Sequence, residues 1–133
     1  MAPTFTSHEL TYLKRQRLGR LATVDANGAP QNNPVGFFVD ESAGHVRIGG
    51  TALARTRKFR NVRRNPHAAL VVDDLESVDP WTVRFVEIRG VAEALEDVDP
   101  PMDGMSREVI LIRPRWIGSL GIEPGHSGLN ARS

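Results

Sequence analysis

The most informative stretch of this sequence is RKFRNVRRNPHAALVVD, residues 57–73. Its first apolar residues recur at helical spacing, with Phe59 and Val62 on one face, which predicts a helix over residues 52–65. Pro66 ends that helix, because proline has no N–H to donate to a further turn. The apolar run that follows the proline predicts a buried strand. A basic helix therefore leads directly into a core strand.

Short predicted strands lie on both sides of this segment. Residues 18–24 and 31–39 are separated by Asn27-Gly28, a pair that supplies the positive φ angles of a tight hairpin turn. Pro30 and Pro34 remove donors from the second strand, so we expect it to be bulged or to lie at an edge. The other strands are predicted over residues 45–50, 68–73, 81–95 (with a bulge or bend at Gly90) and 108–112, with a short seventh over 115–122.

A second helix is predicted near the start of the chain. Thr6 and Glu9 have the spacing of a capping box, and Leu10 and Leu13 follow at helical intervals, which predicts an amphipathic helix over residues 7–16. Six or seven short strands with one helix inserted among them favour a mainly β fold. We expect a small antiparallel barrel that is closed or nearly closed.

Length and composition limit the class of protein. A chain of 133 residues forms one domain, here expected over residues 1–122, with a flexible tail over residues 123–133. No window approaches the roughly 18 apolar residues of a membrane span, and no cationic and apolar leader opens the chain. We therefore expect a cytoplasmic protein. The absence of cysteine excludes disulfides, a thiolate nucleophile and a zinc–thiolate site.

One short segment is strongly basic, although the formal net charge of the whole chain is only +1. A helix N-terminus offers free N–H donors and a positive dipole, so cations placed there form a site for phosphate. Arg57 and Lys58 fall in the first turns, and Thr51 is a candidate N-cap with a hydroxyl donor. The alternatives are a solvated basic face or a nucleic-acid patch, and the latter lacks interleaved aromatic residues. The six cations are Arg55, Arg57, Lys58, Arg60, Arg63 and Arg64.

Other chemical signals are few. The four histidines are scattered, so no metal site is predicted, and the common glycine-rich nucleotide motifs are missing. Trp81 is interpreted either as a core or rim aromatic or as a platform for a flat ring. Residues 32–36 are unusual for a strand and form either a thin surface for a flat ligand or a bulged edge. Tyr12 and His45 are nominal proton donors, and no catalytic residue is assigned.

Five blocks of the sequence carry a resemblance to a known family. They are GRLATV (19–24), NGAPQ (27–31), PVGF (34–37), the basic stretch 57–73 and RGVA (89–92). Together they resemble the pyridoxamine-phosphate-oxidase-like split β-barrel superfamily. More narrowly, they resemble its actinobacterial branch of oxidoreductases that use the deazaflavin coenzyme F420.

The resemblance implies a six-stranded antiparallel split barrel that forms a homodimer, with two cofactor sites at the dimer interface. It also implies which residues bind the cofactor. They are Pro34, Val35, Gly36 and Phe37 at the ring system, Arg57 and Lys58 at the phosphate, Thr51 ahead of the helix, Arg55 toward a further anion, and Trp81 as an aromatic before the long strand. The substrate motif of the vitamin B6 oxidases, Arg-Leu-x-Pro, is absent from the end of this chain.

The implied function is hydride transfer between reduced F420 and a small organic acceptor such as an enone or an imine. An FMN-dependent enzyme of the same fold is the alternative, because FMN also presents a flat tricycle and a phosphate. A non-catalytic cofactor carrier or a basic nucleic-acid-binding module stays open as another class. We expect a homodimer with a small-molecule substrate and with neither a nucleic-acid nor a membrane partner.

Overall fold

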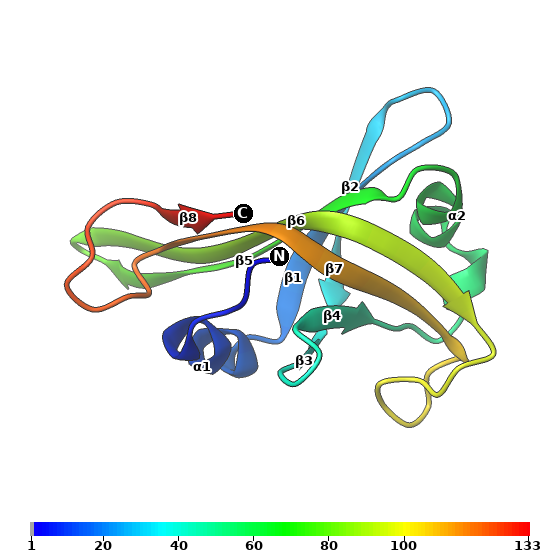
Figure 1. Ribbon diagram of the computed structural model, residues 1–133, viewed down its shortest axis with the longest axis horizontal. Coiled ribbons are helices and arrows are strands. Elements are labelled where there is room, and N and C mark those ends of the chain that lie inside the picture. Colours follow the sequence, from blue (N-terminus) through cyan, green and yellow to red (C-terminus); the bar gives the residue numbers. More distant parts are fainter. Residues whose placement is uncertain (1) are drawn as a thin grey trace.

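The computed structural model describes residues 2–133 and contains one curled antiparallel sheet with two short α-helices (Figure 1). The strand order is β2-β1-β5-β6-β7-β4-β3, and β8 pairs with β7. No helix in this part of the chain is long and apolar enough to cross a membrane. The helical segments are α1 (Ser7–Arg15), the 3-10 turn η1 (Leu53–Arg55) and α2 (Arg57–Arg64). The strands are β1 (Leu18–Val24), β2 (Pro30–Gly36), β3 (Phe38–Asp40), β4 (His45–Ile48), β5 (His67–Val78), β6 (Trp81–Glu96), β7 (Glu108–Leu120) and β8 (Asn130–Arg132).

The curl of the sheet follows from its connectivity. β2 and β3 are the two ends of the strand order, yet β2 ends at Gly36 and β3 begins at Phe38, so only Phe37 joins them. In a flat sheet these ends would lie six strand spacings apart, roughly 29 Å. The sheet must therefore bend until its two edges meet at Phe37. The side chain of this residue is buried in the core.

The strand predictions are confirmed in part. β1, β4 and β6 lie close to their predicted ranges, β2 lies at an edge, and the register shifts beside Gly90. The single strand over residues 31–39 is wrong, because the chain changes its partner from β1 to β4 at Phe37. The predicted break between the strands over residues 108–112 and 115–122 is also wrong, because Arg113 and Pro114 continue the pairing of β7 with β6. The sheet therefore has eight strands and not six.

The basic helix begins later than predicted. Thr56 is the N-cap of α2, and its hydroxyl accepts a hydrogen bond of 3.4 Å from the N–H of Phe59. The prediction of one helix over residues 52–65 capped by Thr51 is therefore wrong, because the extended backbone of Thr56 separates η1 from α2. Phe59 and Val62 are buried, as their spacing predicted, and α2 packs against β1 and β6.

Helix α1 confirms its predicted capping box and is tied to the sheet through Tyr12. The buried Tyr12 hydroxyl donates to Asp74 over 2.9 Å, and Arg84 binds the same carboxylate through Nε and Nη2 at 3.0 and 2.7 Å. These hydrogen bonds, that of Arg84 first, hold the pKa of Asp74 below its ordinary value despite burial. Burial, together with the Asp74 contact, raises the pKa of Tyr12, so its phenol stays protonated.

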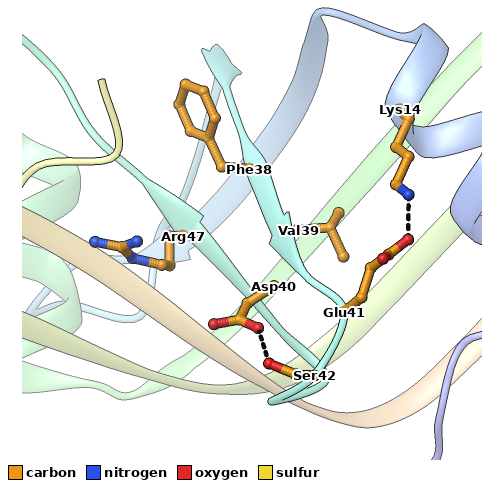
Figure 2. A pocket seen from close by; sticks show the side chains of 7 residues that line it. All are labelled: Lys14, Phe38, Val39, Asp40, Glu41, Ser42 and Arg47. Atoms are coloured by element: carbon orange, nitrogen blue, oxygen red, sulfur yellow. Dashed lines mark hydrogen bonds and ion pairs between the residues drawn. The ribbon is translucent and has the colours of Figure 1, made fainter. Parts of the chain in front are cut away.

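The β3–β4 turn supports the other side of α1. Figure 2 shows Lys14 pointing from the helix toward Glu41 in this turn, and the two form an ion pair. Asp40 closes the turn by accepting hydrogen bonds of 2.9 Å from the Ser42 hydroxyl and 3.0 Å from the N–H of Ala43. These contacts place α1 beside β3, where the two edges of the sheet meet.

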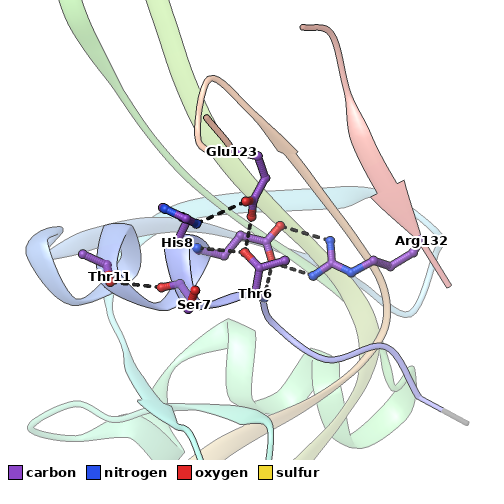
Figure 3. A network of polar contacts seen from close by, with 7 residues as sticks. Thr6, Ser7, His8, Thr11, Glu123 and Arg132 are labelled. Carbon is purple, nitrogen blue, oxygen red and sulfur yellow. Dashed lines mark hydrogen bonds and ion pairs between the residues drawn. The ribbon is translucent and has the colours of Figure 1, made fainter. Parts of the chain in front are cut away.

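The segment after β7 folds back onto the start of α1. The sequence predicts a flexible tail over residues 123–133, but β8 pairs with β7, and Arg132 contacts Glu9 with Nη1 3.0 Å from Oε2 (Figure 3). Glu123 accepts a hydrogen bond from the Thr6 hydroxyl and lies 3.3 Å from the Nδ1 atom of His8. Polar contacts hold this segment, so it shows none of the apolar periodicity that predicts an ordered element.

Glu9 is a fully buried carboxylate. Burial by itself disfavours its charged form, but hydrogen bonds from Arg132 and from the N–H of Thr6 outweigh that cost and hold the pKa of Glu9 below its ordinary value. A lowered pKa means that the charged form of Glu9 stabilises the fold at neutral pH. This contribution is lost as the pH falls through the lowered pKa.

We expect the Arg132→Ala variant to lose about 2 kcal/mol of unfolding free energy at neutral pH, because Glu9 keeps its buried charge without a cation. Without Arg132 the pKa of Glu9 in the folded state rises above its unfolded value, so the loss should shrink at about pH 4, where Glu9 is protonated. Urea unfolding of both proteins at the two pH values measures the difference. In a Glu9→Gln background the same substitution should cost little at either pH. An equal loss at both pH values in the single variant contradicts this account.

Candidate functional site

The start of α2 combines cations with free backbone donors. Arg57 and Lys58 are the first two residues of the helix, the first exposed and the second half-buried, and no acidic residue lies in this turn. Of the six cations in the segment, Arg63 alone forms an ion pair within residues 2–133, with Glu96. The Thr56 hydroxyl caps the N–H group of Phe59. The N–H groups of Arg57 and Lys58 come before that group in the first turn. This turn is therefore suited to an anion, and the phosphate site itself stays a prediction.

A pocket of about 200 Å³ lies between α2 and the β1–β2 turn. Arg57, Arg60 and Arg64 line it, and Asp25 is its single carboxylate. Asp25 already accepts two hydrogen bonds of 2.9 Å from N–H groups of its own turn. The pocket therefore carries surplus positive charge that a phosphate or carboxylate group can neutralise. Lys58 is not among its lining residues, because adjacent helical side chains point about 100° apart.

A buried amide holds α2 in this position. The Nδ2 atom of Asn61, a residue that is 4% exposed, donates to the Thr23 hydroxyl at 3.1 Å and to the Gln31 side chain at 2.9 Å. Gln31 donates in turn to Asn33 over 3.1 Å. This network was not predicted from the sequence. Its signal is that Asn61 is the single uncharged polar residue in the basic run from residue 57 to 64.

The residues predicted to line the ring system alternate in direction. Val35 and Phe37 are buried in the core, whereas Pro34 is exposed and Gly36 half-buried. A Cβ atom added at Gly36 would meet no atom within 4 Å, and its φ is not in the left-handed region, so neither packing nor backbone strain requires a glycine here. Pro34, Gly36 and the strand backbone therefore form the outward surface that a flat ring can contact.

The two halves of the predicted site lie at opposite ends of β2. Asn61 binds Gln31 near the start of the strand, and Arg57 lines a pocket with the β1–β2 turn. Gly36 ends the strand, and the extended backbone from Gln31 to Gly36 spans roughly 17 Å. The pockets beside α2 and beside Gly36 share no lining residue. One chain therefore presents the cations and the ring surface at separate places.

Trp81 lies away from both halves. It opens β6, pairs with Val78 across the β5–β6 hairpin and is 68% exposed, so it is not a core residue. In Figure 1 the turn of this hairpin and α2 lie at opposite ends of the long axis. Leu75, Val78 and Val83 are exposed on the same hairpin, and with Trp81 they form an apolar strip.

The nominal proton donors are not brought to these surfaces. The Tyr12 hydroxyl is occupied by Asp74, as described above, and serves to dock α1. His45 opens β4 half-buried, and its Nδ1 atom has no hydrogen-bond partner within residues 2–133. Neither residue lines the pocket beside Gly36 or the one beside α2. In the same part of the chain no group of three His, Cys, Asp or Glu side chains is arranged to hold a metal ion.

An apolar groove of about 580 Å³ across β1, β5 and β6 was not predicted. Gly90 is one of its lining residues. A Cβ atom at Gly90 would approach the Arg113 carbonyl oxygen to 2.1 Å, so the neighbouring strand requires a glycine at this position. The other lining residues are small or apolar for the most part, with cations at the edge. They include Ala22, Val24, Ala69 and Val91, together with Arg89 and Arg115.

A comparison with protein families gives a match to the Pyridoxamine 5'-phosphate oxidase family over residues 5–118. The chain belongs to this family. Membership confirms the resemblance that the five sequence blocks carry, and the curled sheet agrees with it.

The chain is similar to a named enzyme and to solved structures. The 5a,11a-dehydrotetracycline/5a,11a-dehydrooxytetracycline reductase of Streptomyces rimosus subsp. rimosus is 47% identical over 135 residues, covering 96% of this chain and 92% of that protein. A solved F420 reductase is 29% identical with a TM-score of 0.62, covering 80% of this chain and 93% of that one. The General Stress Protein 26 of Bacillus anthracis has the same fold at 20% identity and a TM-score of 0.64, covering 87% and 93%.

We expect Asn61→Ala to destabilise this family member by about 2 kcal/mol, because it removes a buried donor from two acceptors and leaves a small cavity. Arg64→Ala, an exposed neighbour on the same helix, is the control and should stay within about 0.5 kcal/mol. Thermal and urea unfolding measure both variants. Equal stability of Asn61→Ala and the parent protein would show that the amide does not hold α2 in place.

Proposed function

We propose that this chain is an oxidoreductase that transfers a hydride between reduced coenzyme F420 and an electrophilic carbon of a small organic acceptor. The observation that carries the proposal is the uncompensated cationic start of α2. Two similar proteins support the reaction class, since one is named a reductase and the other an F420 reductase. The first of these names a dehydrotetracycline, which supports a conjugated enone as the acceptor.

Arg57 and Lys58 would bind the phosphate of the cofactor. A guanidinium presents a planar fork to phosphate oxygens, an ammonium adds a point charge, and the free N–H groups of the first turn complete the set. F420 carries a polyglutamate tail as a further anion, and Arg55 and Arg60 are exposed nearby to meet it. Thr51 is exposed ahead of η1, so it would contribute a hydroxyl from outside the helix.

Pro34 and Gly36 would contact the ring system, with Val35 and Phe37 supporting the strand from the core. When bound, the reduced deazaflavin supplies the hydride, and the protein orients its ring and limits competing reactions. Neither Tyr12 nor His45 lies at this surface, so we expect solvent to provide the proton that completes the reduction. The catalytic contribution of the chain is then binding and orientation.

The same surfaces also fit FMN, which has a flat ring and a phosphate but no polyglutamate tail. An FMN-dependent enzyme is therefore the second candidate, and the cations beyond the phosphate site distinguish the two. A cofactor carrier would bind F420 without reducing any acceptor, and a nucleic-acid module would bind DNA in a strongly salt-dependent manner.

A homodimer would bring the separated halves of the site together. In a two-fold assembly the Gly36 surface of one protomer can face the α2 cations of its partner. Two apolar surfaces support such an assembly. They are the groove lined by Ala22, Val24, Ala69 and Val91, and the strip formed by Leu75, Val78, Trp81 and Val83. Trp81 would then approach a cofactor only across the interface. The cytoplasmic location stays a prediction from the sequence.

Lys58→Ala should weaken F420 binding roughly ten- to a hundredfold, because charge-assisted bonds to a phosphate are lost. Quenching of F420 fluorescence by the protein measures the affinity. Arg63→Ala is the matched control, because Arg63 lies on the same helix, is already paired with Glu96 and is not a lining residue of the cationic pocket. An unchanged F420 affinity of the Lys58→Ala variant would show that the basic side chains of the helix only face solvent.

Arg60→Ala should weaken F420 binding more than FMN binding, because only F420 has a tail that needs a further cation. Added salt should reduce the contrast with the parent protein, because it screens the exposed charge pairs that the parent forms with the tail. Titration of the parent and the variant with both ligands gives the comparison. Tight binding of FMN with no binding of F420 would support the second candidate.

Gly36→Val should abolish cofactor binding while the midpoint of thermal unfolding moves little, because the added side chain meets open space in the protein and occupies the place of the ring. Calorimetric melting and fluorescence titration measure the two effects on one sample. A loss of stability that accompanies the loss of binding would give Gly36 a structural role instead.

Sedimentation at micromolar concentration should give the mass of two chains, with an interface above roughly 1,000 Å². Val24→Asp in the apolar groove should convert the protein to monomers and reduce F420 affinity together. A monomeric parent protein that binds F420 tightly would rule out the shared site.

A further inference from the structure

A second pocket lies where the two edges of the sheet meet, separate from the α2 cations. Its volume is about 530 Å³, which is in the usual range of small-molecule sites. Helix α1 and the residues after it form one wall, the end of β2 and the start of β3 form another, and the loop between β6 and β7 forms the third. The side chains that decide its chemistry are Arg17, Phe37, Phe38, Met102 and Met105.

The apolar part of this pocket suits a flat molecule. Phe37 and Phe38 contribute aromatic surface, and Met102 and Met105 contribute flexible thioethers that adapt to the face of a ring. Met102 is 54% exposed, so its side chain contributes little to the core and is available to a ligand. The loop that carries it is anchored by Arg47, whose Nη2 atom donates to the Asp99 carbonyl at 2.8 Å.

The charged part of the pocket is entirely positive. Among residues 2–133, Lys14 and Arg17 are its two charged lining residues, and no carboxylate of these residues lines it. Lys14 is neutralised by Glu41, as Figure 2 shows. Arg17 is exposed after the end of α1 and takes part in no ion pair in the part of the chain that the structure covers. One unmatched guanidinium therefore stands at an apolar pocket.

This pocket also adjoins the proposed ring surface. Gly36 belongs to its lining, and β1 pairs with β2 so that Leu18, the residue after Arg17, lies opposite Gly36. We propose that the pocket binds the hydride acceptor and that Arg17 selects a flat apolar anion, such as the enolate or carboxylate of a polycyclic compound. The position of the ring rests on the proposed function, whereas the selection of an anion rests on the pocket alone.

Anthraquinone-2-carboxylate and its uncharged carboxamide are matched probes for this proposal. Calorimetric titration of the full chain should show the carboxylate binding roughly fivefold more tightly than the amide. This factor corresponds to the binding free energy that one exposed charge pair contributes. Arg17→Gln should remove this preference and leave the amide unaffected. Arg15→Gln is the matched control, because Arg15 ends α1 two residues before Arg17 and lines a different pocket. Met102→Ala should weaken both probes equally and keep the preference.

The outcomes separate this proposal from the proposed function. Equal binding of the two probes, or a preference that survives Arg17→Gln, overturns the role of Arg17. Probe binding that Met102→Ala does not change places the probes elsewhere and overturns the pocket, as does the absence of binding. F420 titration of Arg17→Gln runs beside these measurements. If the parent protein selects the carboxylate through Arg17 but does not bind F420, the proposed function fails and the anion pocket stands.

Discussion

The connection through Phe37 is the constraint on which the rest of the structure depends. It joins the two ends of the strand order with a single residue, so the sheet has to curl. The curl encloses the core, with Phe37 itself inside it. It also brings α1, β3 and the end of β2 together at one place, and the pocket beside Gly36 forms there. A change that let the two edges separate would therefore remove the core and the pocket together.

The charges of the protein fall into two groups. On the sheet most arginines have an acidic neighbour, as in the pairs Arg20–Asp73, Arg84–Asp74 and Arg89–Glu87. These pairs are exposed or partly exposed and contribute modestly to stability. Within the part of the chain that the structure describes, the cations at the start of α2 and Arg17 beside the second pocket form no such pairs. Binding chemistry is therefore proposed at places where the fold leaves charge unmatched, and each proposal makes a ligand the partner of that charge.

Local sequence signals predicted much of the fold and part of the site. The capping box of α1, the prolines of β2 and the bend beside Gly90 act through neighbouring residues, and the structure agrees with each. The predicted start of the basic helix at residue 52, with Thr51 as its cap, is wrong, because contacts around η1 make Thr56 the cap. The family blocks pointed to both halves of the site. The separation of these two halves of the predicted site along β2 depends on strand pairing, and no local sequence pattern contains that information.

Long-range polar contacts escaped the sequence for a similar reason. Asn61 and Glu9 are single polar residues whose partners lie far along the chain, and burial becomes visible only once the sheet is assembled. The contact between Glu9 and Arg132 spans 123 positions. During synthesis, α1 leaves the ribosome long before its cation does. Until β8 has emerged, docking of the helix buries a carboxylate without its cation and is therefore less favourable. The docked helix reaches its full stability only when Arg132 has been synthesised.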